Sequence, residues 1–165
     1  MKKKLALIIA VVLVLSLFTG TVAYAANGTG AGNAQERAQY MDRIREQVSE
    51  VLANRSEIDA LRSQLIALRD QTRTHLQEMC DNPDTVTDEQ IAAAQSLTAE
   101  IKTVRQQLAA TNEEMRQTRL SLRSMRRSRN YEGIIAAYDE VLSVQEQRIA
   151  LLQQMVKLHE QVIAL

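Results

Sequence analysis

The chain has 165 residues, with 20 Lys and Arg, 20 Asp and Glu, one Cys and one Pro. This length allows one domain, and a single cysteine excludes a fold that depends on internal disulfides. Aromatic residues make up only 3% of the chain. Ala, Leu, Gln, Glu and Arg are abundant, which is typical of long helices with a narrow apolar seam.

The N-terminal segment has the order of a secretory signal peptide. Three lysines at positions 2–4 precede an apolar run at 5–18, and Ala23-Tyr24-Ala25 supplies the small residues of a cleavage site. We predict cleavage after Ala25 and an extracytoplasmic protein, either periplasmic or secreted to the cell envelope. An uncleaved anchor is the alternative, but the apolar run of about 14 residues is shorter than the ~20 that span a membrane. With cleavage, the protein contacts the membrane only through the signal peptide, before that peptide is removed.

Cleavage changes the charge of the protein. Removing three of the 20 basic residues while keeping all 20 acidic ones leaves a net charge of −3. This mild charge indicates no polyanionic partner for the chain as a whole. Nucleic acid is not expected either, because no aromatic residues interleave with the basic ones.

Three glycines within residues 26–33 predict a flexible leader, and the remainder predicts three helices. The first covers about 34–79, and its apolar residues repeat every seven positions. Pro83, which lacks an amide hydrogen, ends this pattern. A second helix at about 88–129 opens with a capping box formed by Thr87 and Gln90.

Asn130 and Gly133 mark a weaker second break, which a third helix at 131–165 follows. That helix has three apolar rows, as suits packing against two neighbours, and one row contains Ile134, Val141, Met155 and Val162. Because short connections make sequential helices antiparallel, we predict an all-α, elongated, antiparallel three-helix coiled-coil bundle. The alternative is one long hairpin with the second and third helices continuous, whose seam a second copy completes as a homodimer.

The bundle also predicts where the tyrosines and the first turn lie. Tyr40, Tyr131 and Tyr138 should gather at one end, beside the arginines Arg123, Arg126 and Arg127. At the other end, the turn at 79–87 should project past the third helix as a bare two-helix tip.

A soft-metal site is one candidate binding site. His75 and Met79 lie one helical turn apart, and together with Cys80 they offer the imidazole, thioether and thiolate that suit copper(I) or zinc. The competing interpretation, which we favour, places His75 and Met79 in the seam with no metal bound. The predicted fold sets His159 level with about residue 66, too far from His75 to share an ion. Cys80, beside a turn, is also a candidate for an intermolecular disulfide.

A second candidate is an anionic-surface site formed by the arginines that crowd the end of the second helix: Arg116, Arg119, Arg123, Arg126, Arg127 and Arg129. They could bind phospholipid, lipopolysaccharide or teichoic acid. The alternative is structural, because cations stabilise a helix C-terminus, and the fold would bring acidic side chains such as Glu132 and Asp139 nearby.

No catalytic pattern stands out in the sequence. There is no Ser/His/Asp arrangement with flanking glycines, no glycine loop that opens a helix and no His/Glu metal spacing. We therefore expect no enzymatic activity, no catalytic residues and no cofactor.

A family resemblance comes from the segment Val86-Thr87-Asp88-Glu89-Gln90, which opens a helix after a proline turn in an exported helical chain. It resembles the Leu-Thr-x-x-Gln motif of the Spy/CpxP-like periplasmic stress proteins, with Val86 in place of the motif's Leu. Residues 138–142, with Gln145 and Arg148, look like the last helix of that family. The resemblance implies a concave helical surface that holds unfolded clients.

These observations lead to three functional hypotheses. The first is an exported, non-enzymatic helical binding protein, an envelope-stress chaperone of the Spy/CpxP type with unfolded clients. The second is a structural or adaptor coiled coil that pairs with a partner protein or with itself, and the third is a metal-responsive protein. An exposed apolar concave patch would favour the chaperone, and a seam open along one edge would favour the adaptor.

Overall fold

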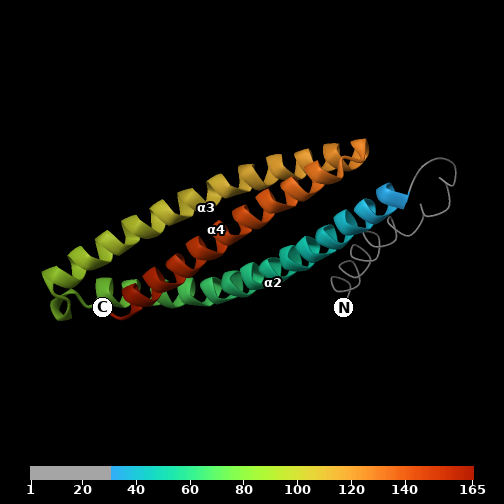
Figure 1. Cartoon of the computed structure of the whole chain (residues 1–165). Coiled ribbons are helices and arrows are strands. Elements are labelled where there is room, and N and C mark those ends of the chain that lie inside the picture. The colour runs from blue at the N-terminus through green and yellow to red at the C-terminus, as the bar shows by residue number, and fades with distance from the viewer. Residues whose placement is uncertain (1–30) are drawn as a thin grey trace, which may run out of the picture. The chain divides into compact units, whose positions relative to one another are not determined.

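Three long helices make up the part of the chain that a computed structural model describes, residues 31–165 (Figure 1). They are α2 (Ala31–Asp81), α3 (Asp88–Ser128) and α4 (Tyr131–Ile163), and a short 3-10 helix, η1 (Pro83–Thr85), joins α2 to α3. The helices pack against one another and residues 31–165 contain no strand, so the predicted all-α bundle is confirmed. The predicted signal peptide and most of the predicted leader lie outside the described residues, while α2 begins at Ala31, inside that leader.

The turn between α2 and α3 follows the chemistry of its sequence. Pro83 occupies the first position of η1, and the capping box at the start of α3 is complete. The Thr87 amide donates to Gln90 Oε1 at 3.0 Å, and the Gln90 amide donates to Thr87 Oγ1 at 3.2 Å. The Gln90 side chain also donates to the carbonyl of Leu165. Because the end of the chain reaches the first turn of α3, the predicted two-helix tip is confined to the short turn around η1.

The chain reverses between α3 and α4 within two residues. Arg129 adopts the left-handed conformation with φ of 54°, and the Asn130 amide donates to the carbonyl of Met125 at 3.1 Å. The side chain of Asn130 then caps α4 by accepting from the amide of Gly133 at 2.9 Å. A Cβ atom at Gly133 would lie 2.7 Å from the sulfur of Met125, so a larger residue here would require the Met125 and Asn130 side chains to shift. The alternative in which the second and third helices are continuous is therefore wrong.

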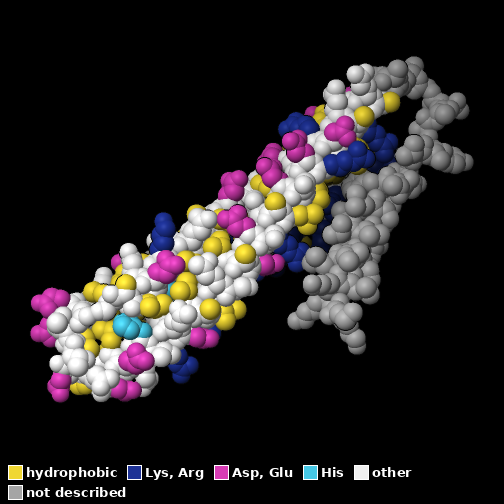
Figure 2. All heavy atoms as spheres, turned by 90° about the horizontal axis from the view of Figure 1, so that it is seen from below, with side chains coloured by type: hydrophobic (Ala, Val, Ile, Leu, Met, Phe, Trp, Pro, Cys, Tyr) yellow, Lys and Arg dark blue, Asp and Glu magenta, His cyan; other side chains and the backbone are white. Residues whose placement is uncertain are grey.

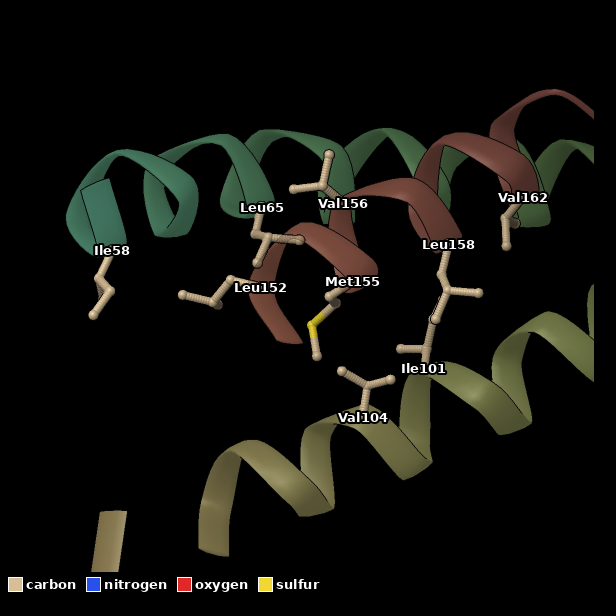
Figure 3. Close-up of a cluster of buried hydrophobic side chains, with 9 residues drawn as sticks. All are labelled: Ile58, Leu65, Ile101, Val104, Leu152, Met155, Val156, Leu158 and Val162. Atoms are coloured by element: carbon tan, nitrogen blue, oxygen red, sulfur yellow. The ribbon is translucent and has the colours of Figure 1, made fainter. Parts of the chain in front are cut away.

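The helix α4 lies between α2 and α3 and supplies most of the core (Figure 1). In Figure 3, side chains of α4 fill the space between Ile58 and Leu65 of α2 and Ile101 and Val104 of α3. The α4 members of this cluster are Leu152, Met155, Val156, Leu158 and Val162. The sequence explains the arrangement, since a helix with three apolar rows buries them only when it has a neighbour on each side.

Side-chain hydrogen bonds set α2 and α4 in parallel. Gln47 Nε2 donates to Asp139 Oδ1 at 2.6 Å, and Thr72 Oγ1 lies 2.9 Å from His159 Nδ1. The predicted level of His159, near residue 66, is therefore wrong by about six residues. That prediction used one constant offset between the two helices, whereas the observed partners are separated by 87 to 96 residues. The sequence separation between partners varies because the helices are tilted and the bonding side chains differ in length.

The tyrosines gather at the end of the bundle that holds the α3–α4 turn, as predicted. The rings of Tyr40 and Tyr131 stack with centroids 6.1 Å apart, and Tyr138 is buried in the adjacent apolar cluster. The guanidinium of Arg126 lies 5.8 Å from the centroid of the Tyr138 ring and donates to its hydroxyl. Arg37, which the prediction did not include, lies at the same distance from the Tyr131 ring.

Among residues 31–165, no helix combines the length and the apolar character that a membrane span requires.

We predict that Arg129→Gly stabilises the protein by about 1 kcal/mol, because glycine adopts the left-handed conformation without the cost that a Cβ imposes. Urea unfolding followed by helical circular dichroism measures this change. The matched control is Arg127→Gly, which removes the same charge from within α3, where glycine costs about 1 kcal/mol. Two shifts of the same sign would contradict the left-handed turn.

Candidate functional site

Two hollows lie between α2 and α3, and residues of α4 line the floor of each. The larger, the central groove, has a volume of about 860 Å³. It is lined by Arg55, Ile58, Asp59 and Arg62 of α2, by Asn112, Met115, Arg116, Arg119, Leu120 and Arg123 of α3, and by Gln145 and Arg148 of α4. The smaller, the end pocket, has a volume of about 380 Å³ and is lined by Arg69, Thr72, Arg73, Leu76, Gln77, Cys80, Thr98, Ile101 and His159.

The arginines line this groove because they follow the same seven-residue repeat as the seam. Arg55, Arg62 and Arg69 recur every seven residues along α2, one position after its apolar seam. Positions that flank a coiled-coil seam point along the edge of the helix interface and meet whatever lies beside it. Seven residues of helix rise about 10 Å, so the arginines of α2 recur at this interval. On α3, Arg116 and Arg123 are also seven residues apart, and Arg119 lies between them.

Arg148 is the central residue of the floor. It is 8% exposed, and its Nη1 donates to Thr111 Oγ1 at 2.9 Å and to Asn112 Oδ1 at 2.7 Å. Thr111 is itself fully buried, and its hydroxyl donates to the carbonyl of Leu108 at 2.8 Å, so this anchor is rigid. Burial, and then the charges of Arg62 and Arg119, lower the pKa of Arg148. Both hydrogen-bond partners are neutral, so this buried cation is held without a carboxylate.

The acidic side chains near the groove neutralise little of its charge. Six arginines and a single aspartate line the central groove. Asp59 lies 3.5 Å from Arg62 Nη1, and Glu113 lies 2.9 Å from Arg116 Nη2; both pairs are more than half exposed. Hydrogen bonds from Arg116 lower the pKa of Glu113 to about 2, so that carboxylate is ionised and occupies Arg116. Exposed pairs of this kind contribute only about 0–1 kcal/mol. With Asp59 and Glu113 both counted against the six arginines, the groove keeps an excess of positive charge.

Basic side chains are unevenly distributed over the bundle. In the face drawn in Figure 2, most of the Lys and Arg side chains (dark blue) lie in the half that holds the α3–α4 turn, whereas acidic side chains (magenta) are spread along the whole length. The central groove belongs to the basic half of α3, whereas the end pocket lies nearer the α2–α3 turn.

His159 occupies the floor of the end pocket. It is 5% exposed, and its Nδ1 shares a hydrogen bond with the hydroxyl of Thr72. Burial lowers the pKa of His159, and the nearby charges of Arg105 and Arg69 lower it further. The neutral imidazole is thus the stable form in the folded protein. The pocket also contains apolar side chains, Leu76 and Ile101 among them.

The predicted arginine cluster is divided between different surroundings. Arg116, Arg119 and Arg123 line the central groove, whereas Arg126 packs on Tyr138. Arg127 and Arg129 are exposed at the end of α3, beside the turn.

The sequence prediction missed Arg55, Arg62 and Arg148 as members of the same site. The signal for Arg148 was present, because it interrupts the otherwise apolar row of α4 that contains Val141 and Met155. The signal for Arg55 and Arg62 was their seven-residue spacing.

The predicted soft-metal residues lie near the α2–α3 turn. His75 and Met79 are partly buried, and Cys80 is exposed with a free thiol. Cys80 lines the end pocket together with His159. Within the described part of the chain, no group of three or more His, Cys, Asp or Glu side chains is arranged to hold a metal ion.

No protein-family model, no curated protein and no solved structure matches this chain. The resemblance to the Spy/CpxP-like proteins, which rests on Thr87, Gln90 and the residues around them, therefore stays a prediction.

We predict that the protein loses stability as the pH falls from about 7.5 to 5.5, and that His159 causes part of the loss. The folded state holds this imidazole at a lowered pKa, so the unfolded chain binds the proton first, near its ordinary pKa of about 6.5, and unfolding is favoured. Urea unfolding at constant ionic strength measures the slope. His159→Gln should have a shallower slope than the wild type, and an unchanged slope would contradict the prediction. His75→Gln is the matched control.

Proposed function

We propose that this chain is an exported, non-enzymatic helical binding protein that holds an acidic segment of another protein in the central groove. One observation carries the proposal: the six arginines, facing one aspartate, along a groove between two helices. The groove also contains Ile58, Met115 and Leu120, which supply apolar contact between the charges. A chain segment with alternating acidic and apolar side chains complements such a surface.

The position of the groove favours the adaptor among the hypotheses. A helix laid between α2 and α3, over the floor of α4, would occupy the place of the fourth helix in a bundle. The arginines that flank the seam recur every seven residues, so a helical partner with acidic residues at matching intervals would meet them in register. The partner we favour is therefore an amphipathic helix with an acidic flank.

A client-holding chaperone of the Spy/CpxP type is the second candidate. The resemblance around Thr87 supports it, and so does an open groove that could receive an extended chain. The exposed large apolar side chains favour it less, because Leu52, Ile66 and Ile91 are spread over α2 and α3 and only Leu120 lies in the central groove. Charge would then select its clients, with apolar surface in a minor role.

Binding of two designed peptides tests the proposal. We expect a labelled amphipathic helix with glutamates beside its apolar stripe to bind, and the same peptide with lysines not to bind, in fluorescence anisotropy. The double variant Arg62→Gln/Arg119→Gln should weaken binding about tenfold, since each arginine–carboxylate pair contributes up to about 1 kcal/mol. Raising the salt to 0.5 M should weaken it further.

The matched control is Arg43→Gln/Arg127→Gln, which removes the same charge outside the groove. Equal binding of both peptides, or an equal loss in the control, would contradict the proposal. An assay of aggregation with unfolded acidic and basic client proteins separates the two candidates. The chaperone suppresses aggregation of the acidic client, whereas the adaptor binds the helical peptide and leaves both clients to aggregate.

A further inference from the structure

Arg148 has donor capacity that its own chain does not use. A guanidinium carries five N–H donors in a planar fork. The described structure assigns two bonds to this group, both from Nη1, to Thr111 and Asn112. The Nε and Nη2 edge, the edge that binds two oxygens of one anion side by side, remains for a ligand from the groove. The two protein bonds fix the plane of the guanidinium and so prepare this edge.

The surroundings of Arg148 make a groove with no anion bound unfavourable. Arg62 and Arg119 face it from the two walls, and their charges act against its own. The acidic side chain that lines the groove, Asp59, is 60% exposed and contacts Arg62 at 3.5 Å, so it is a weak partner that a stronger anion can replace. A buried charge that has neutral partners and two like charges nearby is costly. An anion bound among the three guanidinium groups would remove that cost.

We propose that the floor of the central groove is a phosphate-binding site, in which Arg148 binds two oxygens of one phosphate group and Arg62 and Arg119 close over it from the walls. The site does not depend on the protein partner proposed above, although the two ligands would compete for the groove. Arg148 provides recognition by geometry, and the two wall arginines provide charge.

The charge of the site favours phosphate over a carboxylate. A carboxylate brings one negative charge and two oxygens, whereas a terminal phosphate brings about 1.5 to 2 charges and three oxygens at pH 7. Three guanidinium groups can therefore each find an oxygen, with most of their charge compensated. Arg55 and Arg123 line the same groove further along the walls, which extends the site for a ligand with more than one phosphate.

A chain-length series of soluble phosphates tests the proposal on the whole protein. We expect inorganic phosphate to raise the melting temperature relative to sodium chloride of equal ionic strength, and tripolyphosphate to raise it more. Phosphate stabilises many proteins by exclusion from their surfaces, so the difference between variants is the quantity that counts. Isothermal titration with tripolyphosphate should show binding that Arg148→Met weakens at least about tenfold.

Arg148→Met also has an expected effect without ligand. The substitution restores the apolar row of α4 and removes a buried like charge, so the ligand-free variant should melt at a higher temperature than the wild type. It should also lose the response to phosphate. Arg119→Gln, at an exposed position of the wall, keeps the test informative if the first variant folds poorly, and should lower the affinity severalfold. Arg43→Gln, outside the groove, should keep the wild-type affinity.

An experiment with lipid vesicles distinguishes a lipid phosphate from a soluble one. Flotation with vesicles that contain phosphatidic acid, compared with phosphatidylcholine alone, shows whether a lipid phosphomonoester reaches the site. Binding to phosphatidic acid that Arg148→Met abolishes assigns the lipid headgroup, and a tripolyphosphate response without flotation assigns a soluble phosphate. Equal rises in melting temperature for the wild type and Arg148→Met with every phosphate would contradict the proposed site. So would a ligand-free Arg148→Met protein that melts lower while tripolyphosphate binds it with unchanged affinity.

Discussion

The burial of α4 on two sides is the constraint on which the other features of this bundle depend. Its apolar rows include Ile134, Val141 and Val162, and they are too wide for a single neighbouring helix to cover. With α2 on one side and α3 on the other, α4 becomes the centre of the core (Figure 3). The same placement draws α2 and α3 apart along one face, where their edges border a groove whose floor is α4.

Arg148 occupies a position of α4 that this packing buries. The usual consequence would be an ion pair or an apolar residue, because an uncompensated charge inside a protein is costly. Here the guanidinium is held by the neutral side chains of Thr111 and Asn112, and Thr111 is itself fully buried. Thr111, a polar seam residue of α3, therefore fixes the position of the Arg148 guanidinium.

The central groove and the end pocket differ in chemistry although α2 and α3 line both. The central part is dominated by arginine, with its acidic neighbours held in exposed pairs such as Glu113 with Arg116. The end pocket is smaller and more apolar, and its buried imidazole, His159, is kept neutral by burial and by Arg105 and Arg69. Both floor residues of α4 are thus basic groups whose charge the surroundings disfavour. One of them, His159, can lose its proton near neutral pH, whereas arginine stays protonated.

The sequence by itself determined the helices, their turns and the seams. The capping box at Thr87 and Gln90 and the break at Asn130 are local chemistry, readable without any knowledge of neighbours. The apolar rows, which repeat every seven residues, likewise predicted the bundle and the gathering of Tyr40, Tyr131 and Tyr138. Tertiary structure decided the candidate site, because Arg62, Arg119 and Arg148 are far apart in the sequence and line one groove only where α2, α3 and α4 pack together. Sequence spacing indicated which side chains leave the seam, but the tilt and offset of the helices fixed which of them share one groove.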